Sequence, residues 1–149
     1  MSQSEAAYRG RFAPSPTGPL HLGSLIAAVA SYLDARHHGG YWLVRMEDID
    51  PPREQVGAAE AILNSLHRHG LEWDEDVLFQ GTRSPAYDDA LARLEAEDLL
   101  FRCQCTRQQL GPDGSCSGRC ASLDHAFAGP VALRVRVAPE TAVALDDLV

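Results

Sequence analysis

The stretch from Arg11 to Ser24, RFAPSPTGPLHLGS, combines residue types that bind phosphate. Its order predicts a strand, a loop whose prolines keep it out of a sheet, and the start of a helix. Free N–H groups and the helix dipole favour negative charge at a helix N-terminus, so this turn is a candidate anion site. His21, just before the helix, can donate to a phosphate oxygen, and Gly18 and Gly23 leave room for close approach. These residues predict a phosphate site, in the first place for a nucleotide.

A second group with chemical potential is a set of four cysteines in two close pairs, Cys103-x-Cys105 and Cys116-x₃-Cys120. The segment between the pairs contains Gly111, Pro112 and Gly114, which allow it to fold back sharply. This spacing predicts a structural zinc site with four thiolate ligands and no open position. Two alternatives are reduced, buried cysteines and disulfides, the second being uncommon in a cytosolic chain.

The elements expected around the phosphate site form a strand–helix–strand unit. The strand covers 8–13, the helix runs from Leu22 to about His37, and a continuous apolar strand covers 41–46. Apolar side chains recur at helical spacing along the helix, at Leu25, Ile26, Val29, Tyr32 and Leu33. In open α/β sheets, ligands bind beyond the carboxyl ends of the strands, so Glu47 and His21 should face one crevice.

The rest of the chain predicts further helices and a strand. Asp50-Pro51 predicts the start of a helix that ends near His69. Ser84-Pro85 predicts another, through about Glu97. The expected buried side chains are Ile62, Leu63 and Leu66 in the first of these helices and Leu91 and Leu94 in the second. The alternation at 131–137 predicts a half-buried strand with Arg134 and Arg136 on the solvent side.

Bulk properties limit the classes of function. The chain has 149 residues, 45% hydrophobic residues and a net charge of −8. These values predict a globular domain and exclude a general electrostatic attraction to nucleic acid. Because neither a signal peptide nor a membrane-spanning segment is recognisable, we expect a cytoplasmic protein without a membrane partner. We also expect it to be a monomer.

Taken together, RFAPSPTG, HLGS and RMEDID resemble the signatures of class I aminoacyl-tRNA synthetases of the glutamate-handling branch. The resemblance implies an α/β fold with a Rossmann-type parallel sheet, a small zinc-binding insertion and an incomplete C-terminus. Residues 1–100 would be the first half of the catalytic core, 101–125 the zinc insertion, and 126–149 a strand returning to the core. Ser24 stands where the class motif has histidine, and the lysine-rich second signature has no counterpart here.

The resemblance also implies roles for individual residues. Arg11, Ala13, Ser15 and Glu47 would contact the glutamate substrate, with Glu47 taking the α-ammonium group. The expected ATP-binding residues are Pro14, His21, Gly23 and Ser24, of which the last three would be the catalytic positions. The reaction would form glutamyl-adenylate and pyrophosphate, with Mg²⁺ arriving with ATP, by positioning and charge stabilisation.

Within that branch, the cysteine pattern resembles the zinc insertion of glutamyl-queuosine tRNA(Asp) synthetases. This implies ATP, L-glutamate and tRNA(Asp) carrying queuosine as partners, with glutamate activated without tRNA. Cys116 is the least certain ligand, because some relatives carry tyrosine there, and His125 is a possible substitute. The alternatives are an ordinary glutamyl-tRNA synthetase, a zinc-bearing binding module without catalysis, and a nucleotidyltransferase with an HxGH site.

Overall fold

The computed structural model describes residues 7–116, 118, 120–122, 127, 129–137 and 144. The chain divides into two compact units, Met1–Pro85 and Ala86–Val149, and each is described by itself.

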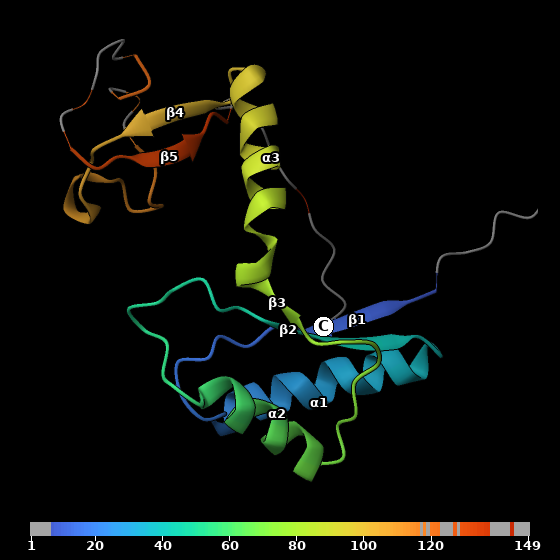
Figure 1. Ribbon diagram of the computed structural model, residues 1–149. Coiled ribbons are helices and arrows are strands. Elements are labelled where there is room, and N and C mark those ends of the chain that lie inside the picture. Colours follow the sequence, from blue (N-terminus) through green and yellow to red (C-terminus); the bar gives the residue numbers. More distant parts are fainter. Residues whose placement is uncertain are drawn as a thin grey trace, which may run out of the picture. The chain divides into compact units, whose positions relative to one another are not determined.

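The first unit is built on a parallel sheet of three strands in the order β1-β2-β3. The strands are β1 (Arg9–Phe12), β2 (Tyr41–Met46) and β3 (Leu78–Phe79). Arg9 pairs with Tyr41, and Arg45 pairs with Leu78. Helix α1 (Leu22–His37) connects β1 to β2, and both α1 and α2 (Ala58–Arg68) lie on the same side of the sheet (Figure 1). The predicted strand–helix–strand unit and α/β class are therefore confirmed.

The core of this unit lies between the sheet and its two helices. Alternate residues of the strands point into it, as the two-residue period of a strand requires. The buried cluster comprises Phe12, Ala28, Ala35, Trp42, Val44, Met46, Ile62, Leu66 and Leu71. Arg9, Arg11 and Tyr41 alternate with these residues and are exposed on the other face of the sheet.

Helix α1 has the predicted bounds, but its apolar residues do not share one buried face. It buries Ala28 and Ala35, whereas Ile26, Val29 and Leu33 are exposed. The reason is close packing on the sheet. A Cβ atom at Gly10 of β1 would lie only 3.0 Å from the Cβ of Ala35, so only small side chains fit at this contact.

The predicted start of α2 at Asp50-Pro51 is wrong. The helix begins at Ala58, after Gly57 in the left-handed conformation with φ of 78°. Pro52 disfavours helical geometry at the residue before it, and the Gln55 amide donates to the Pro16 carbonyl at 2.9 Å. The segment from Asp50 is thereby held against the signature loop as a turn. Ile62 and Leu66 are buried as predicted, and Leu63 is partly buried.

A short 3₁₀ helix, η1 (Gln80–Arg83), leads from β3 into α3 (Ser84–Ala96). Helix α3 has nearly the predicted bounds. It buries none of its side chains, however: Leu91 is exposed, contrary to the prediction, and Leu94 is half-buried.

The second unit contains an antiparallel pair, β4 (Leu100–Cys103) and β5 (Ala132–Val135), and the 3₁₀ helix η2 (Arg107–Gln109). The strand expected in 126–149 is β5, and its partner is β4. The predicted sidedness of this strand is wrong at Arg134, which is half-buried while Leu133 and Val135 are exposed. Its guanidinium reaches inward and donates to the Gly114 carbonyl at 3.0 Å. Arg136 is exposed, as predicted.

Candidate active site

The signature loop encloses a cavity of about 560 Å³ where β1 ends and α1 begins. Its position agrees with the rule that α/β sheets bind ligands beyond the carboxyl ends of their strands. Five of the predicted site residues line it, namely Ala13, Pro14, Ser15, His21 and Ser24. The other lining residues are Phe12, Thr17, Gly18, Pro19, Leu20, Ala27, Gln55 and Ile62.

His21 is the N-cap of α1, and its ring folds back over the first turn. Its Nδ1 accepts from the Ser24 backbone N–H at 3.2 Å, and its Nε2 lies 3.1 Å from the Ser24 hydroxyl. Because Nδ1 is an acceptor, the neutral ring carries its proton on Nε2, which donates to that hydroxyl. A Cβ at position 23 would lie 3.1 Å from the ring, so glycine makes this arrangement possible.

This geometry changes the prediction about the helix amides. The N–H of Ser24, expected to be free for a phosphate, is engaged by His21 in this structure. The difference from the class motif at position 24 concerns the hydroxyl alone, which lies 3.1 Å from His21 Nε2, because any residue at this position would supply the backbone amide.

Arg11 and Glu47, predicted to contact the substrate, do not line this cavity. Arg11 is exposed on the face of the sheet opposite the core. Glu47 follows β2 directly and pairs with Arg45, whose Nη2 lies 2.5 Å from Glu47 Oε1. Alternation along β2 puts Arg45 on the same face as Arg11, because Val44 and Met46 point into the core. The cavity lies where β1 ends and Glu47 lies where β2 ends, and the Glu47 amide bonds to Pro14 of the cavity wall, so both are at the carboxyl end of the sheet.

Arg45 is a residue that the sequence analysis missed. Its side chain is about one-quarter exposed, and its Nε is buried without a hydrogen-bond partner among the described residues. The signal was present in the sequence, since Arg45 precedes the acidic stretch by two residues and thus shares its strand face.

Two backbone hydrogen bonds and one side chain hold the loops around the cavity. The Glu47 amide donates to the Pro14 carbonyl at 2.9 Å, and Gln55 is bound to Pro16 in the same way. Asp48 accepts from the Gly81 amide at 2.8 Å, which joins the end of β2 to η1. The acidic stretch after β2 therefore has a structural role in addition to its predicted binding role.

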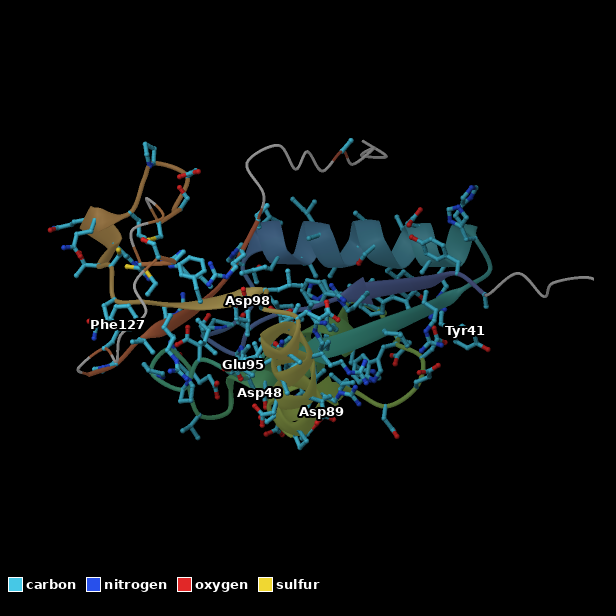
Figure 2. All side chains as sticks on the ribbon, turned by 90° about the horizontal axis from the view of Figure 1, so that it is seen from above. Tyr41, Asp48, Asp89, Glu95, Asp98 and Phe127 are labelled. Carbon is cyan, nitrogen blue, oxygen red and sulfur yellow. The ribbon has the colours of Figure 1, made fainter. Side chains whose placement is uncertain are left out.

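The four cysteines of the second unit come together. Their sulfur atoms all lie within 4.8 Å of one another, and a group of yellow atoms marks them on the orange ribbon of Figure 2. Cys105 Sγ is 3.5 Å from Cys120 Sγ and 3.8 Å from Cys116 Sγ. Tetrahedral Zn–S bonds of about 2.3 Å place sulfurs about 3.8 Å apart, so the donor set fits zinc. His125, the predicted substitute, lies outside the described residues.

The cysteines are free, which is contrary to the disulfide alternative. Burial raises the pKa of the Cys103 thiol, but hydrogen bonds from the Cys105 amide and thiol and from Arg134 outweigh it and bring that pKa to about 7. The hydrogen bond to Cys120, together with that to Cys103, raises the pKa of Cys105 to about 12. Deprotonation of all four thiols would bring several negative charges together in a small volume. A bound divalent cation would compensate these charges.

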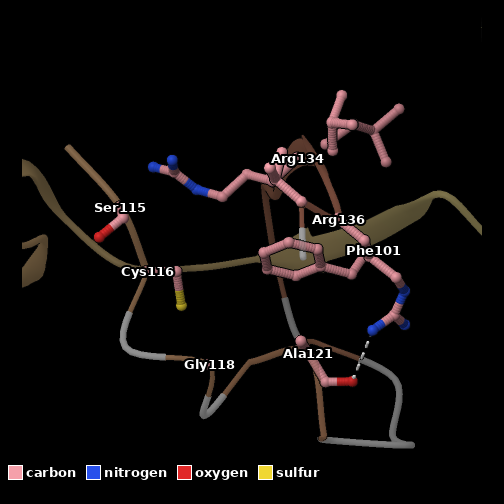
Figure 3. Close-up of a pocket in the computed structure, with 10 residues that line it drawn as sticks. Phe101, Ser115, Cys116, Gly118, Ala121, Arg134 and Arg136 are labelled. Carbon is pink, nitrogen blue, oxygen red and sulfur yellow. Dashed lines mark hydrogen bonds between the residues drawn. The ribbon is translucent and has the colours of Figure 1, made fainter. Parts of the chain in front are cut away.

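A second cavity of about 560 Å³ lies beside this cluster. It is lined by Phe101, Leu133, Val135 and Val137 together with Cys116, Arg134 and Arg136 (Figure 3). Arg136 donates to the Ala121 carbonyl at 3.4 Å, and its guanidinium lies 5.6 Å from the centre of the Phe101 ring. None of the residues predicted to bind ATP or glutamate lines this cavity.

Comparison with known proteins identifies the family to which this chain belongs. Residues 7–115 match the family of class I tRNA synthetases (E and Q), catalytic domain. The chain belongs to this family. The predicted resemblance is thereby confirmed, and the matched stretch includes the signature loop, the acidic stretch and two of the cysteines, Cys103 and Cys105.

Curated relatives extend the match over nearly all of the chain. The glutamyl-Q tRNA(Asp) synthetase of Pseudomonas entomophila is 51% identical over 147 residues, which are 98% of this chain and 49% of the relative. The protein of the same name from Escherichia coli K12 is 53% identical over 135 residues, 90% of this chain and 43% of the relative. The chain thus spans about half the length of these relatives.

Among solved structures, a glutamate tRNA ligase from Elizabethkingia meningosepticum in complex with its amino acid is similar, with a TM-score of 0.64 and 32% identity. The match covers 74% of this chain and 25% of that one.

Among the described residues, none of the helices is long and apolar enough to cross a lipid bilayer.

Proposed function

We propose that this protein takes part in the ATP-dependent activation of glutamate to glutamyl-adenylate and in its transfer to queuosine in the anticodon of tRNA(Asp). The observation that carries the proposal is the cavity formed by the signature loop at the N-terminus of α1, lined by His21 and Ser24. Its position at the carboxyl end of the sheet, where Glu47 is bonded to Pro14 of the cavity wall, supports one substrate site with a nucleotide part and an amino-acid part. We also propose that it acts as a monomer in the cytoplasm.

The charged face suits an amino acid. Arg11 is exposed, and its planar guanidinium can bind a carboxylate through two hydrogen bonds. Glu47 would receive the α-ammonium group. Its pairing with Arg45 holds one carboxylate oxygen at 2.5 Å and leaves the other for the substrate. Arg45 is thus a positioning residue for Glu47.

The cavity suits the nucleotide. In the proposed complex, the Nε2 proton of His21 is shared between the Ser24 hydroxyl and a phosphate oxygen of ATP, and the Ser24 amide keeps the ring in place. An oxygen of the glutamate α-carboxylate then attacks the α-phosphorus, and the bond from that phosphorus to the bridging oxygen of pyrophosphate breaks. The chain supplies position and charge stabilisation for this step, with Ala13, Pro14 and Ser15 shaping the cavity wall. Mg²⁺ bound with ATP would supply charge neutralisation on the phosphates.

The four cysteines would hold one structural zinc ion. Four protein ligands leave no position for a reactive water, so the ion would stabilise the second unit and take no part in the reaction.

The second candidate is an ordinary glutamyl-tRNA synthetase that charges the acceptor end of tRNA. The solved glutamate tRNA ligase favours it, at 32% identity. The glutamyl-Q relatives are about 50% identical over nearly the whole chain, which supports the first candidate.

The test is glutamate-dependent exchange of pyrophosphate into ATP without tRNA. It would use this chain and a chimera in which residues 1–149 replace the matched half of the Pseudomonas entomophila relative. The proposal predicts exchange in the chimera, its loss in His21→Ala, and little change in the control His37→Ala at the other end of α1. Exchange that requires tRNA would favour the second candidate. No exchange with or without tRNA would contradict both and leave a binding module.

A further inference from the structure

Two buried side-chain atoms in the first unit have no hydrogen-bond partner among the described residues. One is Arg45 Nε, a donor, and the other is Gln80 Oε1, an acceptor. Native proteins rarely leave buried polar groups unpaired, so each such atom calls for an explanation. A donor and an acceptor that are both buried and unpaired in the same unit have a simple one, because they can satisfy each other.

The two residues lie at neighbouring strand ends. In the parallel register of β2 and β3, Met46 is paired with Phe79. Gln80 follows Phe79 directly and Glu47 follows Met46, so Gln80 and Glu47 stand side by side where the two strands end. Adjacent strands lie about 4.8 Å apart, a separation that the long side chains of glutamine and arginine can span. Gln80 is therefore within reach of Arg45, two residues before Glu47.

The backbone around Gln80 is fixed against the end of β2. The Gly81 amide donates to Asp48 Oδ1 at 2.8 Å, and a Cβ atom at position 81 would lie only 3.2 Å from the Asp48 carbonyl oxygen. The Thr82 hydroxyl donates to the Phe79 carbonyl at 2.7 Å and closes the turn. Gln80 is thus held next to the acidic stretch by a rigid turn, which is what a positioning group requires.

The role of this pair is indirect, because a substrate cannot touch atoms that are buried. The other end of the Arg45 guanidinium does reach the site, since its Nη2 lies 2.5 Å from Glu47 Oε1. The guanidinium is planar and rigid, so a hydrogen bond at Nε fixes the direction of its other nitrogens. An acceptor at Nε therefore also fixes the carboxylate that the guanidinium holds.

We propose that Gln80 is a positioning residue for the amino-acid part of the site. When substrate is bound, Gln80 Oε1 accepts a hydrogen bond from Arg45 Nε, and the guanidinium holds Glu47 in the orientation that receives the α-ammonium group. Hydrogen bonds of a site are often long or open in the free enzyme and tighten in its complex. The inference rests on the proposed function, because it requires that Glu47 binds the ammonium group.

The first test follows the Arg45 Nε–H by NMR in the zinc-loaded, 149-residue chain, with and without a non-hydrolysable glutamyl-adenylate analogue. The resonance is assigned by its loss in Arg45→Lys. We expect the analogue to slow hydrogen exchange at Nε about tenfold or more, because exchange then requires local opening. The slowing should persist in Gln80→Glu, which retains an acceptor oxygen, and should be absent in Gln80→Met.

Binding of the analogue is followed independently through the Ser24 amide. If the analogue binds and exchange at Arg45 Nε is the same in the wild type and in Gln80→Met, the inference is overturned and the proposed function stands. An analogue that does not bind would contradict the proposed function, and this inference with it.

The second test compares L-glutamate with glutarate, which lacks the amino group, in pyrophosphate exchange by the chimera described above. Gln80→Met should raise the KM for L-glutamate about fivefold, the loss expected for one hydrogen bond. The KM for ATP and the competitive inhibition by glutarate should stay unchanged, because neither involves the ammonium group. In the Arg45→Lys background, Gln80→Met should have no further effect, since the two residues act as one unit.

The matched control is Arg83→Met, at the exposed end of η1, which should leave these values unchanged. Equal weakening of L-glutamate and glutarate by Gln80→Met would show a merely structural role and overturn the proposal. An unchanged KM for L-glutamate would overturn it as well.

Discussion

The two units of this chain are stabilised in different ways. The first, up to Pro85, has a continuous core that includes Trp42, Met46 and Leu66, all fully buried. In the described part of the second unit, the buried hydrophobic residues are Cys103 and Cys120, both members of the cysteine cluster. Small units without enough apolar core generally need a metal or disulfides. The comparison indicates that the first unit folds on hydrophobic burial, and we expect the second to depend on a metal ion bound by its cysteines.

The two cavities differ in the residues that line them. Both have a volume of about 560 Å³. The one in the first unit combines a helix N-terminus with His21 and Ser24, whereas the one in the second is lined by Phe101, Leu133 and the neighbouring arginines. Because the two volumes are equal, size does not distinguish the cavities. The proposed active site is assigned to the first cavity because of its place at a helix N-terminus and because His21 and Ser24 line it.

The largest effect is expected from removal of the zinc ion that we propose the four cysteines bind. Structural zinc contributes about 10–16 kcal/mol of binding free energy to folding, so a strong chelator or Cys105→Ser should unfold the second unit. Hydrogen exchange should then show loss of protection in β4 and β5, while α2 in the first unit keeps its protection. Protected β4 and β5 amides after complete metal removal would contradict the comparison.

The second prediction concerns a substitution in the hydrophobic core of the first unit. Leu66 is fully buried, and Leu66→Ala should cost about 2–5 kcal/mol through lost burial and the cavity left behind. Urea unfolding followed by Trp42 fluorescence measures this cost, and zinc content should remain unchanged. Leu33→Ala, the same substitution at an exposed position of α1, is the control and should cost about 0.5 kcal/mol or less in this chain. Equal costs for the two variants would refute the assigned core.

A smaller effect is expected at Asp74, which accepts from the Trp42 amide and from Arg36, both at 2.7 Å. The Trp42 amide and then the guanidinium lower the pKa of this carboxyl. Asp74→Asn should cost about 1.5–3 kcal/mol at neutral pH, as expected for a hydrogen bond to a charged group. The control is Asp76→Asn, an exposed carboxylate nearby.

The pH dependence of this effect has a definite sign. A lowered folded-state pKa contributes stability that is present above the unfolded value of about 4 and lost as pH falls through the folded value. The difference between the wild type and Asp74→Asn should therefore be constant at pH 6–8 and shrink below about pH 4. A difference that grew on acidification would show that the charge of Asp74 does not stabilise the fold.

The smallest expected effect is at Ser24. Ser24→Ala removes the hydroxyl that lies 3.1 Å from His21 Nε2 and keeps the amide bond to Nδ1. One neutral hydrogen bond is worth about 1 kcal/mol, so pyrophosphate exchange by the chimera should fall about fivefold. Ser24→Thr, which retains a hydroxyl, should restore most of it. If threonine and alanine behaved alike, the hydroxyl would have no positioning role.

Local patterns predicted the elements that local physics determines. The bounds of α1 and β2 followed from apolar periodicity and from the glycines between them. The signature loop and the cysteine spacing were sufficient to predict a crevice at the end of β1 and a cluster of four sulfurs, and the structure has a cavity and a sulfur cluster at these places.

The misplaced residues depend on contacts distant in sequence. The start of α2 is set by Gln55 bonding to Pro16, and Arg134 turns inward to reach Gly114, twenty residues away. The pairing of Arg45 with Glu47 was missed because the acidic residue was considered without its neighbour on the same strand face. No periodicity in the sequence reports the partners of Gln55 and Arg134, whereas the two-residue period of a strand does place Arg45 beside Glu47.

The most direct test of where the site lies is an NMR titration of the zinc-loaded, 149-residue chain with Mg²⁺–ATP and with a non-hydrolysable glutamyl-adenylate analogue. We predict that both ligands shift resonances at the signature loop and the start of α1, with Ser24 prominent among them, and that the analogue also shifts Arg11 and Glu47. The second cavity, at Phe101 and Leu133, should not respond. Shifts confined to that second cavity, or no shifts at millimolar ligand, would contradict the central claim.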